Sequence, residues 1–410
     1  MEKIRKPKIL ITLANFPYPA IDGTKFKILS NISLPLKQFY DLEYLIISLR
    51  KIPENDLRDF EMQYGKAHIF YKNKFSFLVA SLRSFINLFP FQVNGFYSKK
   101  AKIWIKENIN QYQVVYTHTI RVSEIFLGLP KYCLKKIILD FNDALSLNYN
   151  KSKIFASFPL NIVYAVEENL IRSYEKKMLS FFTNFHVVSD YDRTYLLNLD
   201  KNIDKRNIFF ECIPHGVEKS SFVRKNTLDN KIYFIGSLNY EMNLNAIAFF
   251  ISELWFSLKK AIPEMKLHII GNGGENMRFK YQNLKDIDFT GYLDDISSVV
   301  DTCTCLVAPI LSGAGMPTKI IESMSFGIPC VTTPIGARGI RGLKHGENIY
   351  ILDEKNKELW VSTIKRLNED LVLNCRVGQN ALTLFNKSYE LSFIQQKWVD
   401  FFEEVRNMNN

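Results

Sequence analysis

Short runs of apolar residues alternate along the whole chain with longer segments in which apolar residues recur every three or four positions. Uninterrupted runs of four to eight apolar residues predict buried strands, and the longer periodic segments predict helices. Alternation of the two favours parallel sheets, because parallel neighbours need a long crossover connection that is usually a helix. We therefore predict an α/β protein.

The apolar runs divide into two series that together predict two sheets. Strands are expected at residues 9–13, 42–48, 68–71, 114–117, 137–140, 184–188 and 207–213, and again at 232–235, 267–270, 288–290, 303–307, 330–332 and 348–352. Helices are expected at 25–38, 99–110, 166–179 and 392–408. We interpret this as two doubly wound, Rossmann-like domains, residues 1–215 and 216–388, followed by a C-terminal helix, 389–410. That helix either crosses back to the first domain or caps the second.

Several polar residues and glycines come directly after predicted strands. In open α/β sheets ligands bind outside the carboxyl ends of the strands, and a cleft between two facing domains is the default active site. The residues concerned are Asp22 and Gly23, then His118, then Asp140, Asn142 and Asp143, and then Gly236, Gly271 and Gly313.

The segment 309–333 carries the strongest local signal. The apolar run from Cys305 to Ile310 ends in a small-residue turn, Ser312 to Gly315, and Pro317 then opens a helix with Lys319 and Glu322. Backbone N–H groups at the start of a helix suit a phosphate. One turn further on, a carboxylate can accept two hydrogen bonds from a pair of sugar hydroxyls. The alternative is an ordinary strand–turn–helix unit with Glu322 on a solvated face.

Five segments in register resemble the retaining glycosyltransferases of family 4, which have the GT-B fold. They are the segment 309–333, Phe234-Ile-Gly-Ser-Leu-Asn-Tyr240 with Asn243, Leu267-His-Ile-Ile-Gly-Asn-Gly273, Phe289-Thr-Gly-Tyr-Leu-Asp-Asp295 and Ile213-Pro-His-Gly-Val217. The Gly-Ala-Gly turn followed by Lys and Glu-x-Met is similar to a bacterial polysaccharide-assembly branch of that family. The resemblance covers residues 213–340 well and the first half of the chain more weakly.

The resemblance implies a nucleotide-sugar donor site in the second domain. Its residues would be Gly236, Gly271, Tyr292, Gly313, Gly315, Met316, Pro317, Lys319 and Glu322. The backbone around Gly315, Met316 and Pro317 would meet the distal phosphate, Lys319 would add a charge, and Glu322 would hold the ribose. The alternatives are a strand-end tyrosine for Tyr292 and a solvated lysine for Lys319.

In the first domain the resemblance implies that His118 contacts the transferred sugar, and the site's chemistry makes Asp143 a candidate to orient or deprotonate the acceptor. Asp22 and Gly23 would lie on the acceptor side. Alternatively, His118 only makes a hydrogen bond to a backbone group. Asp143 is alternatively a turn residue whose side chain caps its own loop. His215 is interpreted as a linker residue. No metal or other cofactor is expected, because the six histidines are scattered along the chain.

The chain departs from the family pattern at the donor site. The first glutamate of the Glu-x7-Glu motif is replaced by Ala314. The Arg and Lys that clamp the diphosphate are absent from the loop after residue 235, which carries Ser237, Asn239, Glu241 and Asn243 instead. Arg338 is a candidate replacement, or simply a surface arginine.

Charge is distributed unevenly along the chain. The net charge of +11 belongs to residues 1–215, which hold 31 Lys and Arg against 20 Asp and Glu, whereas residues 216–410 hold 22 of each. A basic half favours a polyanionic partner such as an anionic membrane or a lipid diphosphate. No nucleic-acid-binding module is visible. The aromatic segment 76–97, flanked by lysines, is either a membrane-surface segment or a core helix of the first domain.

The cysteines and the apolar runs favour a cytoplasmic protein, with peripheral association on the inner face of the membrane as an expectation. The six cysteines form no CxxC pair and are expected to be free thiols. The first eight residues lack the apolar core of a signal peptide, and no run of about 18 apolar residues is present.

The function expected from these observations is transfer of a hexose from a nucleotide-diphosphate sugar to a glycan acceptor on polyprenyl diphosphate, in bacterial surface polysaccharide assembly. The alternative is a catalytically degenerate GT-B protein that serves as a binding partner in an assembly complex. A nucleotide-sugar epimerase ranks third, since the paired carboxylates it needs are not evident, and a nucleic-acid binder ranks last. The sugar, the base and the linkage are not specified by the sequence.

Overall fold

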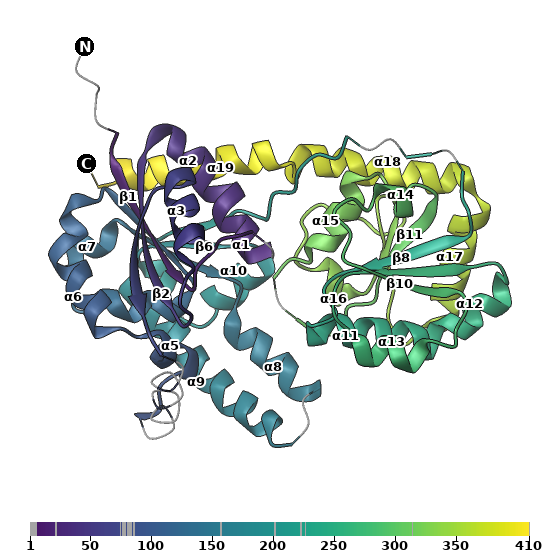
Figure 1. Cartoon of the computed structure of the whole chain (residues 1–410), viewed down its shortest axis with the longest axis horizontal. Helices are drawn as coiled ribbons and strands as arrows, with labels where there is room; N and C mark the ends of the chain where they lie inside the picture. Colours follow the sequence, from purple (N-terminus) through teal and green to yellow (C-terminus); the bar gives the residue numbers. More distant parts are fainter. Residues whose placement is uncertain are drawn as a thin grey trace, which may run out of the picture. The chain divides into compact units, whose positions relative to one another are not determined.

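The computed structural model describes residues 6–20, 23–73, 75, 79, 84, 87–155, 158–200, 202–221, 224–225, 227–313 and 315–409, leaving aside the side chains of 151–155 and 204 (Figure 1). The chain divides into two compact units. The first unit is Met1–Gly216 with Ile394–Asn410, and the second unit is Val217–Phe393. The boundaries expected from sequence were 215/216 and 388/389, so the second break lies five residues further along, inside the last helix.

The first unit contains a seven-stranded parallel sheet in the order β3-β2-β1-β4-β5-β6-β7. Its strands are β1 (Lys8–Ala14), β2 (Asp41–Ser48), β3 (Lys66–Tyr71), β4 (Val114–His118), β5 (Ile137–Asn142), β6 (Asn184–Val187) and β7 (Phe209–Cys212). The order runs outward in opposite directions from β1 and β4. The carboxyl ends of these two strands are therefore the point where a doubly wound sheet forms its binding crevice.

The second unit repeats the same topology with a six-stranded parallel sheet in the order β10-β9-β8-β11-β12-β13. Its strands are β8 (Lys231–Ile235), β9 (Lys266–Ile270), β10 (Ile287–Gly291), β11 (Cys303–Ala308), β12 (Cys330–Thr332) and β13 (Tyr350–Ile351). The order reverses between β8 and β11, so the loops after these strands meet at the equivalent crevice. The prediction of two doubly wound sheets is confirmed.

Every strand predicted from an apolar run is present, because strands covered by helices on both faces must be apolar along their whole length. All six residues of β11 are buried, and so are the five central residues of β1. The one large difference is β13, which is two residues long where a strand over 348–352 was expected.

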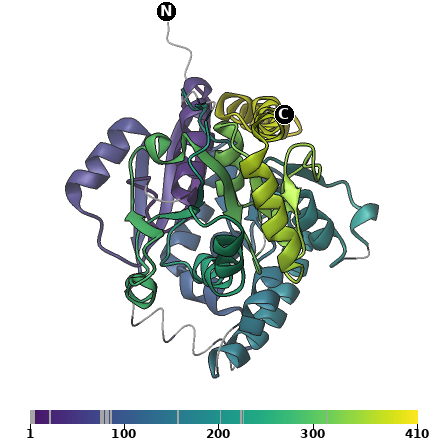
Figure 2. The ribbon, with the colours of Figure 1, turned by 90° about the vertical axis from the view of Figure 1, so that its right-hand side faces the viewer.

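The helices of the first unit cover both faces of its sheet. They are α1 (Gly23–Phe26), α2 (Leu34–Phe39), α3 (Glu54–Gln63), α5 (Phe91–Phe96), α6 (Lys99–Asn108), α7 (Lys131–Lys135), α8 (Leu145–Phe155), α9 (Leu160–Phe181) and α10 (Asp190–Leu197), with 3-10 turns at Ile109–Gln111, Ile120–Phe126 and Ile203–Lys205. Between α1 and α2 lies a π-helical segment, η1 (Lys27–Ser33), where the sequence predicted one continuous helix. Helices α8 and α9 pack on each other as a pair, drawn in teal (Figures 1 and 2).

The helices of the second unit connect its strands in the same way. They are α11 (Glu241–Phe249), a π-helical segment (Phe250–Trp255), α12 (Phe256–Ala261), α13 (Glu275–Tyr281), α14 (Ser297–Val300), α15 (Thr318–Ser325), α16 (Pro334–Ala337), α17 (Lys357–Glu369) and α18 (Leu371–Ser388). Within the described ranges of both units, none of the helices combines the length and the apolar character needed to span a bilayer.

The C-terminal helix α19 (Leu391–Asn407) contributes from Ile394 onward to the core of the first unit. Trp398 and Phe402 are fully buried there, and the Trp398 ring lies edge-on to Tyr116 of β4 with centroids 5.8 Å apart. Gln395 donates from Nε2 to the carbonyl of Ser30 in η1 at 2.7 Å. The aromatic residues of α19 therefore form a packing face, which closes the core beside the carboxyl end of β4.

Candidate functional site

Glycines end the strands of the second unit where loops approach one another closely. A Cβ on Gly236, after β8, would lie 2.7 Å from Asn243 Nδ2 and 2.9 Å from Lys319 Nζ. A Cβ on Gly271, after β9, would lie 2.2 Å from the carbonyl oxygen of Gly236. Gly236 and Gly271 have φ of +148° and +146°, which favours glycine as well. Gly236, Gly271 and Lys319 are thus brought to the same edge of the sheet.

The conformation of the loop after β11 is fixed by its own backbone and by an arginine. Gly313 and Gly315 have φ of +121° and +74°, values that few other residues adopt. The Arg338 guanidinium donates from Nη2 to the carbonyl of Gly313, and burial lowers the pKa of this arginine. A Cβ on Gly339 would lie 2.1 Å from the carbonyl oxygen of Gly315. Arg338 therefore braces the loop, a role that sequence reasoning did not assign to it.

Helix α15 begins where this loop ends. Pro317 occupies the N-cap position, one residue before the first helical residue, and Met316 beside it is buried. A proline has no N–H, so Pro317 shapes the entry and the donors at this end are the N–H groups of its neighbours. Ala314, inside the same loop, lies outside the described residues. The expected strand–turn–helix unit is present.

Lys319 turns back from α15 toward the end of β8. Its Nζ donates to Asn243 Oδ1 at 2.6 Å and lies 4.2 Å from the centroid of the Phe234 ring. Burial lowers the pKa of Lys319 to about 7, against the opposing attraction of Glu322. The solvated-lysine alternative is therefore wrong. Asn243, to which the sequence analysis assigned no binding role, is the residue that holds this lysine in place.

Glu322 lies one turn into α15 and is half-buried. Burial raises the pKa of its carboxyl group, and the neighbouring charge of Lys319 opposes that rise. No side-chain hydrogen bond to this carboxylate occurs within the part of the chain that the structure describes. A half-buried carboxylate without a donor is costly, and a ligand that brought two hydroxyl donors would remove the cost.

Tyr292, after β10, is 70% exposed and free to stack on a planar group.

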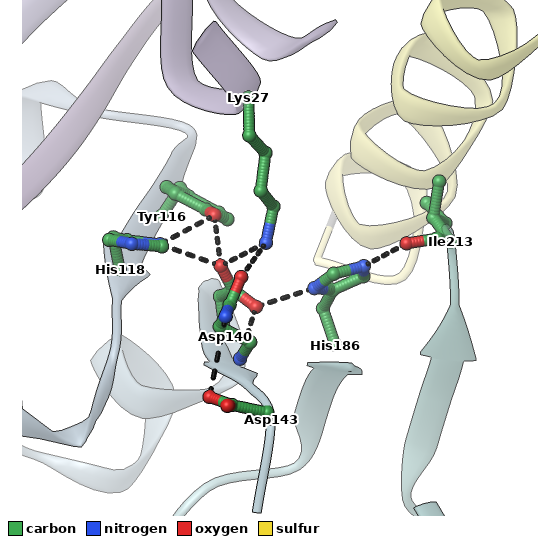
Figure 3. A network of polar contacts seen from close by, with 8 residues as sticks. Lys27, Tyr116, His118, Asp140, Asp143, His186 and Ile213 are labelled. Atoms are coloured by element: carbon green, nitrogen blue, oxygen red, sulfur yellow. Dashed lines mark hydrogen bonds and ion pairs between the residues drawn. The ribbon is translucent and has the colours of Figure 1, made fainter. Parts of the chain in front are cut away.

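In the first unit, five polar groups converge on the carboxylate of Asp140 on β5, next to the switch point of the sheet (Figure 3). Oδ2 accepts hydrogen bonds from Lys27 Nζ at 2.8 Å, from the Tyr116 hydroxyl and from His118 Nδ1 at 2.8 Å. Oδ1 faces His186 Nδ1 at 2.5 Å and accepts from the backbone N–H of Asn142 at 2.7 Å. We call this group the Asp140 cluster.

The Asp140 cluster is built from four separate elements. Tyr116 and His118 end β4, Asp140 and Asn142 end β5, His186 is on β6, and Lys27 opens η1. Burial alone would raise the pKa of Asp140, but Lys27, His186 and the hydrogen bonds from both histidines hold it well below its usual range. Sequence reasoning predicted His118 and noted Asp140, but missed Lys27, Tyr116 and His186. The only signal for Lys27 was its place four residues after Gly23 at the start of a helix.

The remaining candidates of the first unit are placed less favourably for chemistry. Asp143 accepts from Asn142 Nδ2 at 3.3 Å through Oδ1 and from Asn148 Nδ2 at 2.5 Å through Oδ2. Both carboxylate oxygens thus serve the turn into α8, which is the capping alternative considered for this residue. Gly23 begins α1, and Asp22 lies outside the described residues. Of the segment 76–97, the described helix is α5, and most of what precedes it lies outside the described residues.

Comparison with known proteins finds a family match in the second unit. Residues 229–370, most of the second unit, match the family model described as "Glycosyl transferases group 1". The second unit of the chain thus carries a group 1 glycosyltransferase domain. HepE of Anabaena, solved in complex with UDP, has the same fold as this transferase, with a TM-score of 0.63 at 12% identity over 97% of this chain and 100% of that one. The fold is therefore GT-B, as the sequence resemblance implied.

Two curated bacterial proteins are similar to the transferase in sequence. An uncharacterized 44.6 kDa protein in the cps region of Klebsiella pneumoniae is 20% identical over 93% of this chain and 96% of its own length. The UDP-Gal:alpha-D-GlcNAc-diphosphoundecaprenol alpha-1,3-galactosyltransferase of Escherichia coli is 24% identical over 44% of this chain and 51% of its own length. The second match thus spans about half of each protein.

Proposed function

We propose that the transferase is a retaining hexosyltransferase that takes its sugar from a nucleotide-diphosphate sugar, with UDP as the nucleotide. The acceptor would be a glycan carried on polyprenyl diphosphate, in assembly of a bacterial surface polysaccharide. The Escherichia coli relative is named for a UDP-sugar donor and a diphosphoundecaprenol acceptor, and HepE was solved with UDP. Retention of the anomeric configuration is what the family 4 resemblance implies.

The observation that carries the donor assignment is the carboxylate of Glu322. It lies half-buried one turn into α15, after a glycine loop, and has no donor within the described part of the chain. A vicinal diol supplies two O–H donors to one carboxylate. The phosphates would then lie toward the loop and the start of the helix, where N–H groups and the helix dipole favour negative charge.

Lys319 would provide the positive charge that the family usually draws from an Arg and Lys pair in the loop after β8. It comes from α15, yet its Nζ lies beside Gly236 and Asn243 in that same loop. A ligand diphosphate would exchange the neutral contact with Asn243 for a charge-assisted hydrogen bond, which is roughly twice as strong. The absence of the usual pair is thus compatible with donor binding, and it no longer favours the degenerate alternative.

In the proposed reaction the bond between the anomeric carbon and the phosphate oxygen breaks, and a bond from an acceptor hydroxyl oxygen to that carbon forms on the same face. The hydroxyl proton passes to the departing phosphate oxygen. The protein would act mainly by stabilising the charge that develops on the diphosphate. His118, whose Nε2 has no partner within the described ranges, would contact the transferred sugar. No covalent protein nucleophile and no metal are part of the proposal.

The proposal is tested by thermal melting of the protein with UDP, GDP, ADP and CDP. A nucleotide at ~100 times its dissociation constant stabilises the folded state by about 2.7 kcal/mol. We expect UDP alone to raise the melting temperature by several degrees.

Incubation with UDP-hexoses and a polyprenyl-diphosphate glycan should then give a product whose anomeric configuration, read by NMR, matches that of the donor. Folded protein that responds to none of the nucleotides would instead support the degenerate binding partner.

Donor affinity should depend on pH through Lys319. Because burial sets the pKa of this lysine at about 7, it is charged below that pH and loses its charge above it. Bound diphosphate favours the charged form, so affinity should be greatest below pH 7 and fall by up to tenfold per pH unit above it. A UDP-sugar is the right probe, because its diphosphate does not titrate between pH 6 and 8.5. Calorimetry over this range should show the slope in the natural protein and a flat profile in Lys319→Met. An equal slope in both would assign the effect to another group.

A further inference from the structure

Among the residues that the structure describes, none is a hydrogen-bond partner of the Nε2 atom of His118. The Nδ1 atom of His118 is 2.8 Å from Asp140 Oδ2, and the side chain is 5% exposed. A carboxylate only accepts hydrogen bonds, so the proton between these atoms belongs to Nδ1. In a neutral imidazole the other nitrogen, Nε2, must then carry a lone pair. The hydrogen-bonding partner of one nitrogen thus decides what the other can offer a ligand.

We infer that Asp140 is the positioning residue of this site: by taking the Nδ1 proton, it presents His118 as a neutral acceptor whose Nε2 receives a hydrogen bond from a ligand hydroxyl. Because that hydroxyl would belong to the transferred sugar, this part of the inference rests on the proposed function. The tautomer itself does not.

The carboxylate of Asp140 is kept ionised by the number of donors around it. Lys27, 2% exposed, lies 2.8 Å from Oδ2, and the Asn142 N–H lies 2.7 Å from Oδ1. The Tyr116 hydroxyl also donates to Oδ2, since burial and the Asp140 charge raise the pKa of Tyr116 and keep it protonated. The hydrogen bonds that Lys27 and Tyr116 donate to Oδ2 would weaken if the proton moved from His118 to that oxygen. The Nδ1–H form of His118 is therefore the stable one.

The second carboxylate oxygen is fixed by His186. The Nε2 atom of His186 faces the backbone carbonyl of Ile213 at 2.9 Å. Its Nδ1 lies 2.5 Å from Asp140 Oδ1, so the two ring nitrogens contact the carbonyl and the carboxylate respectively. Asp140 is therefore held from the β6 and β7 side as well as from β4 and η1, and its carboxyl plane cannot turn away from His118.

The charged groups around His118 oppose its taking a second proton. Burial is the largest effect that lowers its pKa, and Lys27 and Arg121 add to it, while Asp140 opposes them. His186 and His215 lie in the same cluster of charges, and burial lowers the pKa of His215 to about 3. An imidazolium would make Nε2 a donor and reverse the polarity of the contact. The surroundings of His118 thus favour a ligand group that donates, such as a sugar hydroxyl, over one that only accepts.

The tautomer is measurable without any substrate. Protein labelled with ¹⁵N-histidine, observed by long-range ¹H–¹⁵N correlation, distinguishes a pyrrole-type nitrogen, which carries a proton, from a pyridine-type nitrogen. We expect His118, identified by its loss in His118→Gln, to show pyrrole-type Nδ1 and pyridine-type Nε2 from pH 8 down to pH 6. His68 is an internal control, because its Nε2 and not its Nδ1 faces a carboxylate, Glu43 Oε2 at 2.9 Å. Pyridine-type Nδ1 at His118, or an imidazolium at pH 7, would overturn the inference.

Two variants separate positioning from simple structural support. Asp140→Asn offers both an acceptor oxygen and an N–H donor, so His118 should lose its single tautomer. If that variant does not fold, Lys27→Met still tests the cluster: removing a positive charge should raise the pH at which His118 titrates, and an unchanged titration would contradict the arrangement.

A donor in which the contacted sugar hydroxyl is replaced by fluorine should lose about tenfold in kcat/KM with the natural protein. That loss should be absent in His118→Ala.

The two proposals fail in different ways. If no nucleotide binds but His118 shows the expected tautomer, the proposed function fails and the positioning by Asp140 stands. If a nucleotide binds and sugar is transferred but His118 shows the opposite tautomer, the positioning fails and the transferase assignment stands.

Discussion

Replacing Glu322 with alanine should abolish the UDP-induced rise in melting temperature. A hydrogen bond to a charged group contributes about 1.5–3 kcal/mol, and a diol would make two of them with this carboxylate. Losing both should weaken UDP binding by roughly 10²-fold or more, since 1.4 kcal/mol corresponds to a factor of ten. Transfer should fall at least as far, because the ribose contact anchors the donor throughout the reaction.

The same substitution should leave the unliganded protein as stable as before, or slightly more stable. The Glu322 carboxylate is half-buried, burial raises its pKa, and it has no hydrogen-bond donor in the described part of the chain. Such a group costs stability that only a ligand recovers, as is common where a site is built for binding. Melting curves with and without UDP therefore separate loss of binding from loss of folding.

Two controls sharpen the assignment of Glu322. Glu275→Ala removes an exposed glutamate from the first turn of another helix, α13, and should keep the full UDP response. In the natural protein, 2′-deoxy-UDP should bind more weakly than UDP, whereas Glu322→Ala should bind the two equally weakly. A UDP response that survived in Glu322→Ala, or a 2′-deoxy effect that survived there, would show that the ribose is held elsewhere.

Asp140→Asn should be the most destabilising single substitution in the first unit's site. The change removes the negative charge beside Lys27, whose side chain is 2% exposed and cannot reach water without local opening. Removing one partner of a buried ion pair typically costs about 3–5 kcal/mol, because the remaining charge is left uncompensated. Lys27 of η1 and both histidines would lose contacts as well, since all of them bond to the same carboxylate.

A double-mutant cycle tests the physical reason for that loss. Lys27→Met keeps most of the side-chain volume and removes the charge, so Asp140→Asn combined with Lys27→Met should cost clearly less than the sum of the single changes. Unfolding in urea, followed by hydrogen exchange of the β5 amides, reports the first unit alone. The control is Lys344→Met, which breaks an exposed pair with Glu347 in the second unit and should change little. Additive losses in the cycle would mean that Lys27 and Asp140 are not coupled, contrary to the 2.8 Å contact.

The backbone architecture was largely predictable from the sequence, and the reason is local. Strands in a covered parallel sheet need apolar residues on both faces, which leaves short, unbroken apolar runs such as those of β1 and β11. The glycine loop and the start of the helix between Gly313 and Glu322 were equally predictable, because the glycines, the proline and the following helix are close together in the chain. The π-helical segment η1 was not predicted, since its extra residue per turn leaves no mark on the hydrophobic period over seven residues.

The side-chain arrangements that define the two candidate sites depend on contacts between residues far apart in the chain. Lys27 and Asp140 are separated by 113 positions, and Lys319 and Asn243 by 76. A single sequence records that these residues are polar, but not which of them meet. Asp143 shows the reverse case: its place after a strand made it a catalytic candidate, whereas its bonds to Asn142 and Asn148 place it in the turn into α8.

What the sequence determined by itself was therefore the series of strands, the two doubly wound sheets and the glycine loop that leads into α15, because each follows from the period of apolar residues or from turn chemistry within a few positions. Tertiary structure alone decided that Lys319 lies beside Asn243, that Arg338 braces the glycine loop, and that Asp140 gathers Lys27, Tyr116, His118 and His186. These outcomes depend on how strands pack side by side, and burial then changes the protonation of the groups that meet, which no local pattern encodes.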